Sequence, residues 1–167
     1  MKPSPTLRIH IIDDDPAISL LLVRLLSSMG HQVSSFQNPT ACPVYTNPHC
    51  DCPSDLPCAD VIISDIMMPK MDGIEFFKNQ RQRGCKAPDA NKALMSASVS
   101  PLQQTAVAEL GCHFIRKPFH IAEIRQWLEE CGERISSGRE RMQRAESSPF
   151  HACVPGKDPV EWSPSCD

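Results

Sequence analysis

Aspartates stand at the ends of two strand-like runs in this sequence. Asp13, Asp14 and Asp15 follow an Ile-rich run, and Asp65 closes a second apolar run. In a parallel sheet such ends share one edge, where repulsion raises carboxylate pKa values unless a cation neutralises them. Oxygen donors of this kind suit Mg²⁺ or Mn²⁺. The three adjacent aspartates are equally compatible with a helix N-cap, where orphan amides favour Asp.

A hydroxyl and an ammonium group fall at the same predicted edge. Ser96 ends another apolar run, and Lys117 follows the last one. By itself Lys117 reads as a solvated surface lysine. Together with a carboxylate nucleophile and a bound metal ion, these groups suit phosphoryl transfer, because the attacking oxygen needs charge shielding and the phosphoryl oxygens need donors.

Strand-like and helix-like runs alternate along the chain and position these side chains. The predicted strands lie at residues 7–12, 33–36, 59–64, 92–96 and 113–116, and the last three have an apolar centre. Amphipathic helices are predicted between them, at residues 16–29, 73–83, 101–110 and 120–131. This alternation predicts an α/β fold with a parallel sheet between two helical layers and a ligand site at the carboxyl ends of the strands.

Four short motifs resemble those of the receiver domain of two-component response regulators. They are Asp13-Asp14, the string from Asp65 to Gly73, Met95-Ser96-Ala97 and Lys117-Pro118-Phe119. Their order and separation agree with the family over residues 6–132. The resemblance implies a five-stranded, doubly wound, flavodoxin-like domain. It also implies that Asp65 accepts a phosphoryl group from a histidine kinase or a phosphotransfer protein.

The same resemblance assigns roles to the other residues of the motifs. Mg²⁺ or Mn²⁺ is held by Asp13, Asp14, Asp65 and the backbone carbonyl of Met67. Ser96 hydrogen-bonds the phosphoryl group and Lys117 pairs with it. Phe114 is at the position of a switch aromatic residue, although simple core packing explains a Phe there equally well. Pro118 is at a position where the family carries a cis peptide bond.

The segment 37–59 departs from the family pattern, which has a second helix there. It contains five Pro and four Cys, a composition hostile to a long helix. Thiols clustered in a reducing compartment indicate metal before disulfides, so we predict Zn²⁺ on Cys42, Cys50, Cys52 and Cys58, with His49 as a further candidate. An iron–sulfur cluster, two disulfides and free thiols stay open. We interpret the single cysteines Cys85, Cys112 and Cys131 as small buried hydrophobes.

Composition limits the function classes. The 167 residues carry 17 Lys and Arg against 20 Asp and Glu, so a net charge of −3 argues against a nucleic-acid partner. The sequence shows no apolar run long enough to span a membrane and no signal-peptide pattern, which predicts a cytoplasmic protein. Apolar periodicity stops after Cys131, so residues 133–167 are interpreted as a disordered tail.

The sequence therefore predicts a stand-alone phosphorylation switch that binds a downstream protein and is not an enzyme. A metal or redox sensor acting through the cysteine segment is the alternative. A small aspartyl phosphatase is a weaker one, because Pro16 and Ala17 do not continue the aspartate motif in the way such an enzyme needs.

Overall fold

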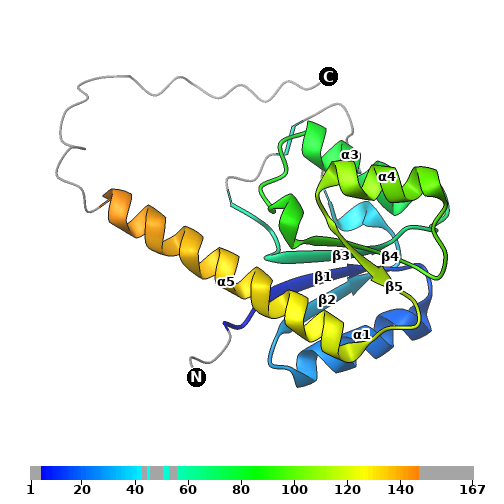
Figure 1. The fold of residues 1–167 in the computed structure, drawn as a ribbon, viewed down its shortest axis with the longest axis horizontal. Helices are drawn as coiled ribbons and strands as arrows, with labels where there is room; N and C mark the ends of the chain where they lie inside the picture. The colour runs from blue at the N-terminus through cyan, green and yellow to red at the C-terminus, as the bar shows by residue number, and fades with distance from the viewer. Residues whose placement is uncertain (1–4, 43–44, 46–50, 53–55, 147–167) are drawn as a thin grey trace.

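A computed structural model describes residues 5–42, 45, 51–52 and 56–146 of the chain (Figure 1). Five parallel strands form one sheet in the order β2-β1-β3-β4-β5. The strands are short; they are β1 (Arg8–Ile12), β2 (Gln32–Phe36), β3 (Val61–Asp65), β4 (Lys92–Ser96) and β5 (His113–Arg116). The predicted doubly wound fold is confirmed.

Helices cover both faces of this sheet (Figure 1). They are α1 (Pro16–Ser28), α3 (Gly73–Gln82), α4 (Pro101–Leu110) and α5 (Ile121–Glu146). Apolar side chains of α1 and α5 pack on one face in a core that includes Leu22 and Trp127. Those of α3 and α4 pack on the other face with Phe77 and Val107. Every residue of β3 and β4 is buried, as expected for central strands covered on both faces.

Local sequence signals fix where the helices begin and end. The side chain of Asp15 accepts hydrogen bonds from the amides of Ala17 and Ile18 and caps α1. Ser100 and Gln103 form a reciprocal capping box at the start of α4, and Gly111, with φ of 64°, ends that helix. The helices therefore start directly after the loops that leave the carboxyl ends of the strands.

Helix α5 differs from the prediction, because it continues to Glu146 rather than ending at Cys131. Arg134 lies in this continuation and donates to Asn91 Oδ1 at 2.8 Å and to the carbonyl of Ala90 at 3.1 Å. Arg134 therefore ties the beginning of this continuation to the turn before β4. The prediction used only the apolar period of the sequence, which does not show such a contact between distant elements. A disordered tail from residue 133 is thus wrong for residues 133–146, and residues 147–167 lie outside the described part of the chain.

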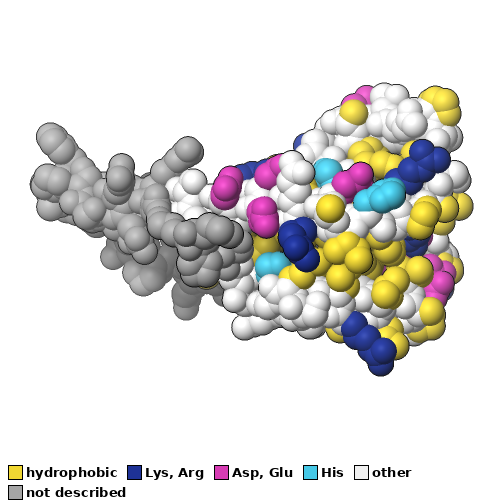
Figure 2. All heavy atoms as spheres, turned by 60° about the horizontal axis from the view of Figure 1, so that its bottom comes forward, with side chains coloured by type: hydrophobic (Ala, Val, Ile, Leu, Met, Phe, Trp, Pro, Cys, Tyr) yellow, Lys and Arg dark blue, Asp and Glu magenta, His cyan; other side chains and the backbone are white. Residues whose placement is uncertain are grey.

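The face that carries α1 shows gathered hydrophobic side chains (Figure 2). Leu20 and Leu21 of α1 are both about half exposed. A groove is lined by residues that include Leu25 of α1, Met29 directly after α1 and Leu128 of α5. Within the described residues, no helix is both long and apolar enough to cross a membrane.

Candidate functional site

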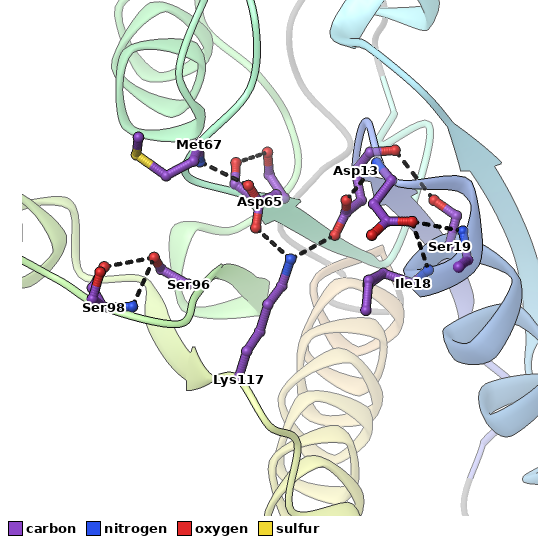
Figure 3. Close-up of polar contacts among 11 residues, drawn as sticks. Asp13, Ile18, Ser19, Asp65, Met67, Ser96, Ser98 and Lys117 are labelled. Atoms are coloured by element: carbon purple, nitrogen blue, oxygen red, sulfur yellow. Dashed lines mark hydrogen bonds and ion pairs between the residues drawn. The ribbon is translucent and has the colours of Figure 1, made fainter.

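Two aspartates and one lysine meet at the carboxyl edge of the sheet (Figure 3). Ile12 pairs with Ser64 in the ladder between β1 and β3, so the next residue of each strand, Asp13 and Asp65, reaches the same level. Lys117 Nζ lies between their carboxylates, 2.9 Å from Asp13 Oδ2 and 2.6 Å from Asp65 Oδ1. Three residues that are far apart in the sequence thus form one ion-pair network.

The end of β5 positions Lys117 near the two aspartates. Its backbone amide donates to the carbonyl of Ser96 at 2.9 Å, which ties the residue to the end of the neighbouring strand β4. The Lys117–Pro118 peptide bond is cis, as the family resemblance implied. The prediction that Lys117 joins the aspartates, rather than being solvated alone, agrees with this geometry.

Burial and charge act in opposite directions on these groups. Asp13 and Asp65 are 1% and 5% exposed. Burial raises the pKa of Asp65 and the charge of Asp13 adds to this rise, while the hydrogen bond from Lys117 opposes it. Burial alone would lower the pKa of Lys117, but its hydrogen bonds to the two aspartates raise it overall, so its ammonium stays charged. The site therefore holds a carboxylate whose charge is only partly compensated.

The loop after β3 fixes the second oxygen of Asp65. The amide of Met67 donates to Asp65 Oδ2 at 2.7 Å. Gly73, the first residue of α3, packs so closely that a Cβ there would lie 2.2 Å from the carbonyl oxygen of Asp65. Lys70 in the same loop takes a left-handed conformation with φ of 73°, which is uncommon for a residue other than glycine. The Met67 amide thus holds the carboxylate of Asp65, and Gly73 leaves room for the backbone of the same residue.

Asp14 and Asp15, both within the described residues, form no bond to Lys117 and differ from Asp13 in their surroundings. Asp14 is exposed, and Asp15 is the N-cap of α1. Asp13 is held by the amide of Asp15, which donates to its Oδ1 at 2.9 Å. The two interpretations of the aspartate cluster thus apply to different residues: Asp15 caps the helix and Asp13 belongs to the site.

Ser96 ends β4, and Phe114 lies in the neighbouring strand β5. The hydroxyl of Ser96 donates to the carbonyl of Ser98 at 2.6 Å, and Figure 3 shows it turned toward Ser98. Phe114 is half-buried and packs against the core formed by α3 and α4. It also lines a cavity of about 250 Å³ together with Ala97, Val99 and Arg116. Phe114 therefore has both core contacts and free space next to it.

The donor set fits a hard cation. Receiver domains generally bind Mg²⁺ at the phosphorylation site. Here the carboxylates of Asp13 and Asp65, with Asp14 adjacent to them, offer the oxygen donors that Mg²⁺ prefers. In the described part of the chain, no three His, Cys, Asp or Glu side chains converge closely enough to hold a metal by themselves. A backbone carbonyl or water would complete the coordination, which is usual for Mg²⁺.

The predicted zinc site is not supported. Among the described residues Cys42, Cys52 and Cys58 are free thiols and do not form a group that could hold a metal ion. Cys50 and His49 lie outside the described residues. The spacing along the chain suggested four ligands, but the fold places Cys42 and Cys52 against the end of α3 instead.

Several contacts of the site could not be predicted from the motifs one by one. The Met67 amide and the close packing of Gly73 are set by the backbone path after β3. Ser19 on α1 donates to the carbonyl of Asp13 at 3.2 Å and fixes the loop after β1. The only sequence signal for Ser19 is its position one helical turn after the cap residue Asp15.

Comparisons with known proteins agree with this geometry. The model of the response regulator receiver domain family matches residues 9–129. The transcriptional regulatory protein FixJ of Azorhizobium caulinodans is 30% identical over 145 residues, which are 84% of this chain and 63% of FixJ. The DNA-binding transcriptional regulator NtrC of Salmonella typhimurium is 31% identical over 138 residues, 81% of this chain and 26% of NtrC. The chain thus spans about a quarter to two thirds of the length of these relatives.

Solved structures show the same fold. The receiver domain of the Francisella response regulator 1452 superposes with a TM-score of 0.63 at 22% identity, covering 78% of this chain and 99% of that domain. The chemotaxis protein CheY4 of Vibrio cholerae gives a TM-score of 0.59 at 22% identity, covering 76% and 99%. Since the family match covers most of the sequence, this chain belongs to the response regulator receiver domain family, whose members act in phosphorelay signalling.

Proposed function

We propose that Asp65 is the phosphoacceptor of this receiver domain. The observation that carries this proposal is the position of its buried carboxylate, which is bonded to Lys117 and lies beside Asp13 at the carboxyl edge of the sheet. An oxygen of Asp65 forms the new bond to phosphorus, and the leaving group of the donor departs with the electron pair of the broken bond. The product is an acyl phosphate, in which the negative charge lies on the phosphoryl oxygens rather than on the Asp65 carboxylate, so the site must supply cations and hydrogen-bond donors to those oxygens.

The remaining site residues stabilise the transferred group. Lys117 keeps its positive charge and can follow the negative charge from the carboxylate to the phosphoryl oxygens. Asp13, Asp14, Asp65 and the carbonyl of Met67 would hold Mg²⁺. When bound, the ion shields the charge between the attacking carboxylate and the phosphoryl group.

Ser96 and Phe114 form the proposed response to phosphorylation. The Ser96 hydroxyl, now bonded to Ser98, turns to a phosphoryl oxygen, and this movement changes the loop from Ala97 to Val99. The cavity next to Phe114 is lined by this same loop, so the ring has space to turn inward when the loop moves. The outer surface near Phe114 would thereby differ between the two states and select a downstream partner.

Partners follow from the family and not from any contact seen here. Receiver domains of response regulators pair with histidine kinases, so we expect a histidine kinase or a phosphotransfer protein as donor. FixJ and NtrC are named as transcriptional regulators, but this chain matches only part of each. A protein partner rather than a nucleic acid, and a cytoplasmic location, therefore stay predictions. The family is generally not enzymatic, and we expect phosphorylation and dephosphorylation of Asp65 to be the only chemistry of the domain.

Incubation with acetyl phosphate and Mg²⁺, followed by intact-mass measurement, tests the assignment. The parent chain should gain one phosphoryl group, and the gain should disappear with a chelator. Asp65→Asn should abolish it. Asp72→Asn is the matched control, because Asp72 is an N-cap residue whose role Asn can fill. A phosphoryl group on the Asp65→Asn chain at the parental rate would refute the proposal.

A further inference from the structure

Ser19 is a polar residue on the buried side of α1. It is 6% exposed and shares this side of the helix with Leu22 and Leu26. A serine inside a helix commonly bonds a carbonyl one turn earlier in the same helix. The hydroxyl of Ser19 instead reaches out of the helix and donates to the carbonyl of Asp13 at 3.2 Å (Figure 3). This buried hydroxyl therefore bonds a residue of the phosphorylation site.

Asp13 is held at each of its polar groups. Its backbone amide donates to the carbonyl of Phe36 at 3.1 Å, which ties it to the end of β2. Its two carboxylate oxygens accept from the amide of Asp15 and from Lys117, each at 2.9 Å. Its carbonyl accepts from Ser19. Of these four partners, Ser19 is the one that lies inside a helix, so it couples the position of α1 to that of Asp13.

The carbonyl that Ser19 bonds belongs to the peptide unit between Asp13 and Asp14. A peptide unit is planar, so the direction of this carbonyl also sets the direction of the Asp14 amide and the point from which the Asp14 side chain starts. Asp14 is exposed, and its placement therefore depends on its backbone. Mg²⁺ requires short, nearly octahedral coordination, which makes its binding sensitive to small displacements of carboxylate ligands.

We infer that Ser19 is a positioning residue for the divalent-cation site. The inference rests on the proposed function, in which Asp13 and Asp14 hold Mg²⁺. Ser19 touches neither the ion nor the phosphoryl group, and it acts through the peptide unit between the two aspartates. Without its hydroxyl, the buried carbonyl of Asp13 loses a donor and both carboxylates are held less firmly. The affinity for Mg²⁺ should then fall about threefold to tenfold, the loss expected for one neutral hydrogen bond.

The space beside Ser19 allows variants that separate its hydroxyl from its shape. Ser19 lines a cavity of about 200 Å³ together with Leu20, Val23 and Phe36, so one added methyl group can be accommodated. S19T keeps the hydroxyl, and S19V has the same shape without it. S19A removes the hydroxyl and adds no atom. Alanine is also a better helix former than serine, so S19A should fold as the parent does.

Titration calorimetry with MgCl₂ on the full chain measures the Kd for Mg²⁺ directly. S19A and S19V should bind the ion about threefold to tenfold more weakly than the parent. S19T should bind it as the parent does. The matched control is S28A, because Ser28 at the opposite end of α1 also donates its hydroxyl to a backbone carbonyl, that of Leu25 at 2.6 Å. S28A should leave the Kd for Mg²⁺ unchanged.

The rate of phosphorylation by acetyl phosphate gives a second measurement. In S19A and S19V, the Mg²⁺ concentration at half-maximal rate should rise by the same factor as the Kd, while the maximal rate at saturating Mg²⁺ stays parental. A parental Kd in S19A and S19V, a loss in S19T equal to that in S19V, or an equal loss in S28A would overturn the inference. Phosphorylation of the Asp65→Asn chain would instead refute the proposed function, so the two failures are distinguishable.

Discussion

At the scale of single residues, Asp65 is held in an ionised form that its surroundings do not favour. Burial and Asp13 raise its pKa, and Lys117 compensates only in part. The folded chain therefore binds a proton at Asp65 more readily than the unfolded chain does. Stability falls as pH rises from the ordinary Asp pKa through the raised one, because the folded state then holds a charge that it accommodates poorly.

Removing this charge should stabilise the fold. We expect Asp65→Asn to raise the free energy of unfolding at pH 7 by about 0.5–2 kcal/mol, the range of single stabilising substitutions. The gain should vanish well below pH 4, where Asp is neutral in both states. Urea unfolding of both chains across this pH range is the measurement. Equal or lower stability of the variant at pH 7 would show that the Lys117 bond outweighs burial.

Gly73 is a second residue whose identity the site requires. A Cβ at this position would meet the carbonyl oxygen of Asp65 at 2.2 Å and the side chain of Leu94 at 2.9 Å. Gly73→Ala should therefore destabilise the chain by about 1–3 kcal/mol and slow phosphorylation of Asp65.

The matched control for this change is Gly138→Ala. Gly138 lies in the continuation of α5, where nothing would contact the new Cβ. Alanine favours a helix by up to about 1 kcal/mol over glycine, so this variant should keep the phosphorylation rate and lose no stability. The measurements are the rate of phosphorylation by acetyl phosphate and the free energy of unfolding in denaturant, each for both variants. A Gly73→Ala chain that matches the parent in both would contradict the close packing around Asp65.

At the scale of elements, Asp89 links the start of β4 to the end of α3, because it bonds a buried lysine of β4 and an arginine of α3. Lys92 is 1% exposed, and its ammonium lies 2.9 Å from Asp89 Oδ1 and over the ring of Phe77. Arg81 on α3 bonds the other oxygen of Asp89 and the last carbonyls of α4. Burial would raise the pKa of Asp89, but hydrogen bonds from Lys92 and Arg81 outweigh it and lower the pKa.

Breaking this pair should be costly because Lys92 would stay buried without its counter-charge. Asp89→Asn is expected to lower the free energy of unfolding by about 2–4 kcal/mol at pH 7. The folded-state pKa of Asp89 is lowered, so the difference from the parent should be full above about pH 4 and shrink below it. Adding Lys92→Met to this variant should recover part of the loss. Thermal unfolding of the three chains between pH 3 and 7 measures both effects.

Elements with a sustained hydrophobic period could be predicted from the sequence, and contacts between distant elements could not. The strands at residues 92–96 and 113–116 and the helix at 101–110 agree with the structure, because each carries its own apolar pattern and end signals. The convergence of Asp13, Asp65 and Lys117 followed from strand alternation alone. The continuation of α5 instead includes contacts between distant elements, such as the bonds of Arg134 with Ala90 and Asn91. The burial of Lys92 and the contact of Cys42 with α3 are likewise tertiary effects.

At the scale of the whole molecule, the two edges of the sheet differ in how well their charges are balanced. The amino edge is tied by polar contacts between elements, such as the bonds of Arg8 with Asp60 and of Arg134 with Asn91. The carboxyl edge instead holds two buried aspartates against one lysine. Uncompensated charge is thus concentrated at the edge where a ligand binds, while the opposite edge supplies stability.

A ligand that neutralises the carboxyl edge should therefore stabilise the entire chain, because both helical layers pack on the same sheet. Beryllofluoride with Mg²⁺ mimics a phosphoryl group on the aspartate and binds only the folded state. At a free ligand concentration one hundred times its Kd, the gain is about 2.7 kcal/mol. This corresponds to a rise in Tm of roughly 5–10 °C for a chain of this size. Scanning calorimetry with and without beryllofluoride measures it. Asp65→Asn should show no rise, and an equal rise in that variant would mean that the mimic binds elsewhere.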